Sequence, residues 1–189
     1  MLGSSMWALA REYDWSKLLV EIAHPDLNLL ATRINETAHL AVREGKDVLF
    51  IDCAHASRVV AAVGRTGELH PLHCTAHGKA MLADADESEL CALLGSGPLR
   101  KFTKNTITTI KALAEDCATI HEIGYALDDS EHADELRCIA APIRFNKQIV
   151  GSIGISAPAP RLPDSLCSDY GKEVCAIADK IAVSLRNSE

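Results

Sequence analysis

The chain has 189 residues, of which 48% are hydrophobic and 24% charged, a composition typical of one globular domain. Its formal net charge is −7, and such an acidic surface argues against contact with a DNA backbone, because nucleic-acid affinity rests largely on Lys and Arg. No apolar run reaches the roughly 18 residues that a membrane-spanning helix needs, and no signal peptide opens the chain. Any DNA-binding role must therefore come from a segment outside these residues.

Seven cysteines are scattered singly along the chain, and none forms a CxxC pair. Neither a secreted disulfide framework nor a zinc-ribbon spacing can be drawn from them. The pattern predicts reduced, mostly buried thiols in a cytoplasmic protein, and no motif in the chain indicates a cofactor. The cysteines are Cys53, Cys74, Cys91, Cys117, Cys138, Cys167 and Cys175.

The beginning of the chain is predicted to be helical. Residues 1–13 are expected to be a tag remnant or a frayed terminus, and residues 14–187 to form the domain. Asp14–Ala23 carries apolar residues at helical spacing. Pro25 is expected to begin a second helix, because a proline in the first turn of a helix loses no hydrogen bond.

Short β-prone runs come next. Thr37–Arg43 and Asp47–Cys53 are expected to form a hairpin across the turn at Glu44–Lys46. Arg58–Val63 is expected to be a third strand, before the turn at Gly64–Gly67.

The middle of the chain returns to helical patterns. Thr75 is expected to cap a short helix through Ala83. Asp86 followed three residues later by Glu89 is typical of a capping box and predicts another helix. Thr109–Ile123 is expected to be a longer amphipathic helix that ends at a glycine.

The last third is predicted to contain three strands and a closing helix. The strands are expected at Tyr125–Leu127, Leu136–Phe145 and Ile149–Ala157. Asp164 is expected to cap a helix that ends near Arg186. The whole order of elements predicts an α+β domain, with helices packed on a mostly antiparallel sheet of about six strands.

Four segments carry recognisable motifs in a fixed order. Pro71–Ala83 reads PLHCTAHGKAMLA, and Leu99–Ile107 reads LRKFTKNTI. Ile123–His132 reads IGYALDDSEH and is followed by RCIAAPI, and Ile153–Leu162 reads IGISAPAPRL. In this order and spacing, from about residue 15 to residue 186, they resemble the C-terminal domain of the IclR family of bacterial transcription regulators.

The resemblance implies a GAF-like or profilin-like fold, with a curved antiparallel sheet flanked by helices. It implies that the domain binds a small organic acid as effector and assembles into homodimers or homotetramers. Family members have a winged helix-turn-helix domain ahead of this one, and about a dozen residues leave no room for it here. DNA contact is therefore expected only through a separate N-terminal domain, and the sequence names neither the effector nor the operator.

The same resemblance implies the residues of an effector pocket. A carboxylate is expected to meet the helix start at Ala76, His77 and Gly78, where backbone N–H groups and the helix dipole favour an anion. Asp128 and Cys138 correspond to the pocket aspartate and cysteine of the family.

One strand departs from the family pattern at the pocket wall. Many relatives carry two serines on alternate positions where this chain has Gly154 and Ser156. Both positions would line the same wall, so Gly154 is expected to add space for a bulkier or less polar ligand than a small keto acid.

Three further residues are not assigned to the effector pocket. Arg137 is expected to be a surface or interface charge on the opposite face of its strand, and Lys79 an exposed helix residue. Glu135 stands where relatives commonly place Gly, so the loop geometry there is expected to differ.

Other classes of function stay open at this point. A metal sensor could use borderline ligands, and a small enzyme could use Cys138, His132 and Asp128, but no HExxH, CxxC or nucleophile-elbow motif supports either. A plain oligomerisation module with no ligand is a third class, distinguished by whether Asp128, Cys138 and Ser156 surround one pocket. The conceivable metal ligands are His73, Cys74, His77, His132 and Cys138.

Overall fold

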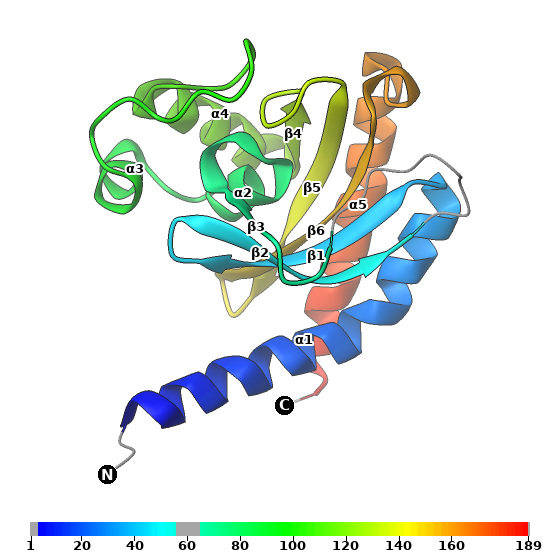
Figure 1. The fold of residues 1–189 in the computed structure, drawn as a ribbon. Coiled ribbons are helices and arrows are strands. Elements are labelled where there is room, and N and C mark those ends of the chain that lie inside the picture. Colours follow the sequence, from blue (N-terminus) through cyan, green and yellow to red (C-terminus); the bar gives the residue numbers. More distant parts are fainter. Residues whose placement is uncertain (1–3, 56–64, 189) are drawn as a thin grey trace.

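A computed structural model describes the backbone of residues 4–55 and 65–188, and the side chains from residue 15 onward within those ranges. A single sheet of six antiparallel strands in the order β3-β2-β1-β6-β5-β4 forms its centre (Figure 1). The strands are β1 Thr37–Glu44, β2 Asp47–Ala54, β3 Leu69–Pro71, β4 Ala126–Asp129, β5 Leu136–Phe145 and β6 Gln148–Pro158. The helices are α1 Ser4–Ile34, α2 Ala76–Met81, α3 Glu87–Leu94, α4 Ile110–Ile123 and α5 Asp164–Arg186, with 3-10 turns at Leu72–Cys74 and Ala159–Arg161. The predicted α+β class is confirmed.

The N-terminal helix differs from the prediction. The expected break at Pro25 is wrong, because α1 runs without interruption from Ser4 to Ile34. A proline inside a helix removes one backbone hydrogen bond and disfavours the turn before it. Here Leu19, Leu27 and Leu30 are fully buried on either side of Pro25, and their packing keeps the helix continuous. The domain boundary at residue 14 stays a prediction.

The first three strands agree only in part with the expected ones. The β1–β2 hairpin and its turn are confirmed, with Gly45 in the left-handed region at φ 60°. The strand expected at Arg58–Val63 lies outside the described residues. The short strand β3, which pairs with β2, was not predicted, because three residues are too few to show an alternating pattern.

The helices of the middle segment begin where their caps were predicted. Thr75 Oγ1 accepts from Gly78 N at the start of α2, and Asp86 forms the reciprocal capping box with Glu89 at the start of α3. Gly124 ends α4 in the left-handed conformation, as predicted.

The last helix begins differently from the prediction. Pro163 occupies the cap position of α5, and the side chain of Asp164 makes no capping hydrogen bond. Asp164 instead accepts from Arg137 of β5 at 2.6 Å. A strand-to-helix ion pair thus replaces the expected cap.

The two faces of the sheet are covered by different helices (Figure 1). Alternate residues of β1, β5 and β6, such as Leu40, Ile139 and Ile155, pack with α1 and α5 in one large apolar core. The other residues of these strands face α2, where the apolar clusters are smaller and polar side chains are buried as well. The candidate site lies on this second face.

Candidate functional site

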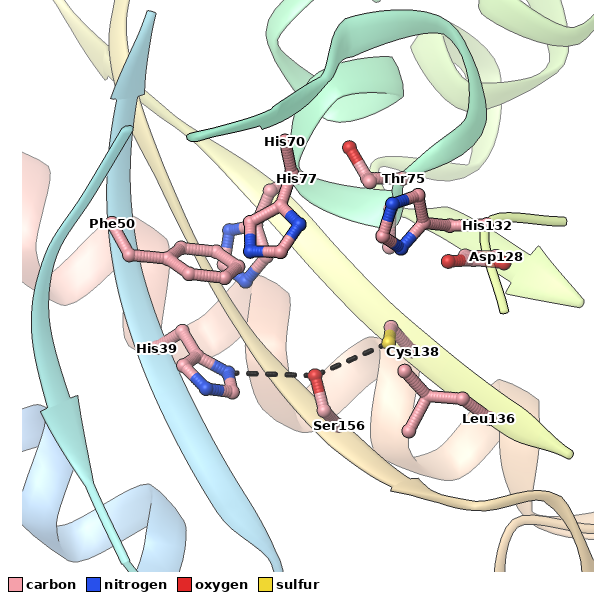
Figure 2. Close-up of a pocket in the computed structure, with 11 residues that line it drawn as sticks. His39, Phe50, His70, Thr75, His77, Asp128, His132, Leu136, Cys138 and Ser156 are labelled. Carbon is pink, nitrogen blue, oxygen red and sulfur yellow. Dashed lines mark hydrogen bonds between the residues drawn. The ribbon is translucent and has the colours of Figure 1, made fainter. Parts of the chain in front are cut away.

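A cavity of about 120 Å³ lies between α2 and the sheet. Its floor is formed by side chains of β1, β2, β5 and β6, and its wall by α2, β4 and the loop after β4 (Figure 2). The lining residues are His39, Phe50, His70, Thr75, Ala76, His77, Asp128, His132, Leu136, Cys138 and Ser156. The cavity therefore combines apolar side chains with a set of convergent polar groups.

Three predicted site residues form one row across the sheet. Asp128 on β4 pairs with Cys138 on β5, and Cys138 pairs with Ser156 on β6. The antiparallel register brings the three side chains to the same face, and all three are buried and line the cavity. A separation into different cores, which would have favoured a plain oligomerisation module, is not observed.

A hydrogen-bonded chain extends this row toward β1. Cys138 Sγ donates to Ser156 Oγ at 3.1 Å, and Ser156 Oγ lies 3.4 Å from Nδ1 of His39 (Figure 2). Burial, with a smaller contribution from Asp128, raises the pKa of the Cys138 thiol. Cys138 is therefore a protonated donor, and its hydrogen bond goes to Ser156 and not to His132 as a catalytic Cys-His pair would require.

Asp128 carries a carboxyl group that is almost completely buried. Its exposed fraction is 1%, and its Oδ1 accepts from the backbone N–H of Glu131 at 2.7 Å. Burial raises its pKa to about 7, although that backbone hydrogen bond works in the opposite direction. Near neutral pH this carboxyl exists in both protonation states and can both accept and donate.

Three histidines of the cavity are held neutral. Burial, with smaller contributions from His55 and His70, lowers the pKa of His39 to about 3. Burial also lowers the pKa of His77 and of His132. His77 Nδ1 lies 2.9 Å from Ser152 Oγ on β6. Neutral imidazoles offer one donor and one acceptor each, so these three side chains make the cavity polar without adding positive charge.

Two of the three residues predicted at the start of α2 lie at the cavity. Ala76 and His77 line the cavity, and N–H groups in the first turn of a helix have no acceptor within the helix. Gly78 is not among the lining residues. Its N–H is taken by Thr75 Oγ1, and a Cβ there would lie 2.1 Å from the carbonyl oxygen of Leu72. Gly78 thus lets the 3-10 turn approach α2.

Gly154 does not create the space that the sequence suggested. It is absent from the cavity lining, and a Cβ at this position would lie 2.3 Å from the carbonyl oxygen of Ile139 and 2.7 Å from Cβ of Ala140. The absent side chain is therefore replaced by close packing of β5 against β6. The expectation of a larger pocket at this end is wrong.

Lys79 is the clearest correction. Instead of being exposed, its side chain is 1% accessible and forms ion pairs with Glu131 and with Asp116 of α4, the latter at 3.0 Å. Burial alone would lower the pKa of Lys79, but the two carboxylates outweigh it and raise that pKa. The buried cation joins α2, α4 and the loop that follows Asp128.

Arg137 on β5 and Glu135 just before that strand also differ from what was expected. Arg137 faces away from the cavity as expected, but it is buried, pairs with Asp129 and Asp164, and donates to the carbonyl of Leu162. Glu135 adopts φ 63°, a left-handed conformation that glycine adopts more readily. The backbone conformation that a glycine would favour is therefore kept despite the Glu.

Several lining residues were not predicted as ligand-site residues. His39 and Phe50 lie on strands that were correctly predicted, and they stack at a centroid distance of 4.7 Å. His39 alternates with the core residues Ala38 and Leu40, whereas Phe50 is itself part of a buried apolar cluster. His70, Thr75 and Leu136 were not singled out for the pocket either, and His132 was considered only as a metal ligand or catalytic residue.

The metal-sensor alternative would need a cluster of ligand side chains. Among the described residues, no group of three or more His, Cys, Asp or Glu side chains is placed to hold a metal ion. His73, one of the conceivable ligands, instead donates from Nε2 to the carbonyl of Arg100 at 2.9 Å.

Residues 15–183 match the family model described as bacterial transcriptional regulator IclR C-terminal. The chain belongs to the IclR family. This IclR-type domain is 32% identical over 189 residues to the transcriptional repressor IclR of Escherichia coli K12, covering 97% of this chain and 68% of the repressor.

Solved structures of IclR-type proteins have the same fold. Thermotoga maritima IclR superimposes with a TM-score of 0.82 at 28% identity, covering 93% of this chain and 74% of that one. An IclR homologue from Microbacterium hydrocarbonoxydans, solved with 4-hydroxybenzoate, gives a TM-score of 0.82 at 25% identity, covering 98% of this chain and 75% of that one. These names describe regulators and not enzymes. Within the described part of this chain, no helix is both long and apolar enough to cross a bilayer.

Proposed function

We propose that this IclR-type domain senses a small organic acid in the cavity between α2 and the sheet. The observation that supports it is the convergence of Asp128, Cys138 and Ser156, from three adjacent strands, on one cavity roofed by the start of α2. Ligand sites typically combine apolar walls with a few placed polar groups. The cavity lining has this composition.

The size of the cavity limits the ligand. An apolar cavity of roughly 150 Å³ holds a benzene molecule, so about 120 Å³ suits a single ring or a short-chain acid. The bound 4-hydroxybenzoate of the Microbacterium relative is a ligand of this kind. The N–H groups in the first turn of α2 can donate hydrogen bonds to a carboxylate, and Phe50 supplies an aromatic wall.

The domain would act within a longer cytoplasmic regulator whose N-terminal domain binds operator DNA. The chain spans about two thirds of the E. coli repressor, and its acidic charge of −7 leaves DNA contact to another domain. A ligand that binds one arrangement of a homodimer or homotetramer better than another shifts the equilibrium between them by its differential affinity. The spacing of the attached DNA-binding domains would change with it.

A thermal-shift screen of small carboxylic acids, including 4-hydroxybenzoate and pyruvate, tests the proposal. We expect at least one acid to raise the Tm of the wild type in a concentration-dependent manner. Leu136→Trp fills the cavity and is expected to abolish that shift. Leu69→Trp, the same change at a leucine that is 55% exposed, is the matched control and should retain it. Equal ligand shifts in both variants would place the ligand elsewhere and refute the proposed site.

A further inference from the structure

A chain of three side chains crosses the floor of the cavity from β5 to β1 (Figure 2). Cys138 donates to Ser156 Oγ at 3.1 Å, and Ser156 Oγ lies at the longer distance of 3.4 Å from His39 Nδ1. The sequence pattern suggested that Cys138 and Ser156 contact the ligand themselves. Their hydrogen bonds point instead to each other and to a histidine on the far strand.

The direction of these hydrogen bonds follows from proton counting. The buried thiol of Cys138 keeps its proton and donates it to Ser156. The single proton of the Ser156 hydroxyl is then free to point at Nδ1 of His39. A neutral imidazole that accepts at Nδ1 carries its own proton on Nε2.

The far nitrogen of His39 is left without a partner. His39 is 1% exposed, and among the described residues nothing accepts a hydrogen bond from its buried Nε2. Phe50 stacks on the face of the ring, so only the ring edge is available for a polar contact. A buried donor with no acceptor is unfavourable, and a ligand oxygen that enters beside the ring would satisfy it.

We propose that His39 Nε2–H is the donor that anchors a carboxylate oxygen of the ligand, and that Ser156 and Cys138 are positioning residues that fix its tautomer. This inference rests on the proposed function and adds a binding residue that the sequence did not indicate. It also changes the role of two predicted contacts, because Ser156 and Cys138 act on the ligand through His39.

The tautomer is measured directly by ¹⁵N NMR of histidine-labelled domain, without any ligand. We expect His39 to appear as the Nε2–H form in the wild type and to lose that preference in Ser156→Ala. Cys138→Ser keeps a donor to Ser156 and should keep the Nε2–H form. An Nδ1–H form of His39 in the wild type would overturn the inference.

Ligand binding is measured by titration calorimetry with 4-hydroxybenzoate and pyruvate as probes. His39→Phe keeps a ring against Phe50 and removes the donor, and it should raise the Kd of a bound probe about tenfold. His73→Phe, a buried histidine outside the lining, controls for a general loss of stability and should leave Kd within about twofold.

A double-mutant cycle separates positioning from contact. If Ser156 acts only through His39, Ser156→Ala weakens binding in the wild type and has no further effect in His39→Phe. Additive losses would mean that Ser156 touches the ligand itself and would refute the positioning role. If the wild type binds a probe and His39→Phe binds it equally well, the anchoring role of His39 is refuted while the proposed function stands. If neither probe binds the wild type, the proposed function fails for these acids and the anchoring role fails with it.

Discussion

The two faces of one sheet show two ways of burying side chains. Toward α1 and α5, the strands contribute Leu40, Ile139, Ile153 and similar residues to one apolar core. Toward α2, the alternate positions of the same strands bury His39, Ser152 and other polar residues. The first face stabilises the fold through the apolar surface area that it buries, since each buried aliphatic side chain contributes roughly 1.5–3 kcal/mol.

On the second face, the buried polar groups need hydrogen-bond or ion-pair partners. A buried polar group is tolerated only when it is hydrogen-bonded, and a buried charge only when it is paired. The charges of the Lys79 cluster are paired, whereas the Nε2 atoms of His39 and His77 have no hydrogen-bond partner among the described residues. This contrast shows where to test for ligand binding, because the proposed ligand would find unsatisfied polar partners on the second face.

The largest effect is expected from breaking the Lys79 cluster. Lys79→Met leaves the carboxylates of Glu131 and Asp116 without their cation, and removing one partner of a buried pair is destabilising by roughly 3–5 kcal/mol. Urea unfolding followed by circular dichroism measures it. The double variant Lys79→Met/Glu131→Gln should recover part of the loss, and a Lys79→Met domain as stable as the wild type would contradict the pairing.

The second effect is a pH dependence on the cavity face. Because the pKa of Asp128 is about 7 in the folded domain and 3.8 as a free group, the native state binds more protons than the unfolded chain between these values. Stability therefore falls as pH rises from about 4 to 7, by roughly 4 kcal/mol at most from this group, and stays reduced above.

Asp128→Asn isolates this contribution. The amide oxygen can still accept from Glu131 N but does not titrate, so the variant should gain stability over the wild type as pH rises to 8. Urea midpoints at pH 4, 6 and 8 provide the comparison. A difference between the two proteins that is constant with pH would show that Asp128 does not titrate in this range.

The third effect tests the apolar face. Leu40 is fully buried in the core shared with α1 and α5, and Leu40→Ala should destabilise the domain by about 3 kcal/mol through lost transfer energy and a residual cavity. Because Leu40 points away from α2, the Kd of a probe acid should not change. Weaker binding in Leu40→Ala, measured well below its unfolding transition, would mean that the two faces are coupled.

The sequence predicted the elements whose signals are local. The caps at Thr75 and Asp86 and the hairpin turn at Gly45 depend on a few adjacent residues, and all three were correct. Pro25 was misjudged because the packing of α1 against the sheet is a tertiary effect that outweighs local preference.

The candidate site was only partly predictable for the same reason. Asp128, Cys138 and Ser156 were found through the family resemblance, and the register of β4, β5 and β6 places them in one row. His39 lies 117 positions before Ser156 in the chain, and its contact with Ser156 depends on the β1–β6 pairing. Lys79 was misread because no local pattern shows that Asp116, 37 positions later in the chain, lies beside it.

The smallest effect sharpens the comparison within the cavity face itself. Asp86→Ala removes the side-chain half of the capping box at the start of α3, the hydrogen bond that Asp86 Oδ1 accepts from Glu89 N, which should destabilise the domain by about 1 kcal/mol. None of the cavity-lining residues lies on α3, so the probe Kd should stay the same while amide exchange in the first turn of α3 accelerates. Faster exchange in α2 as well would show that the helices over the cavity open as one unit, and the ligand would then stabilise all of them.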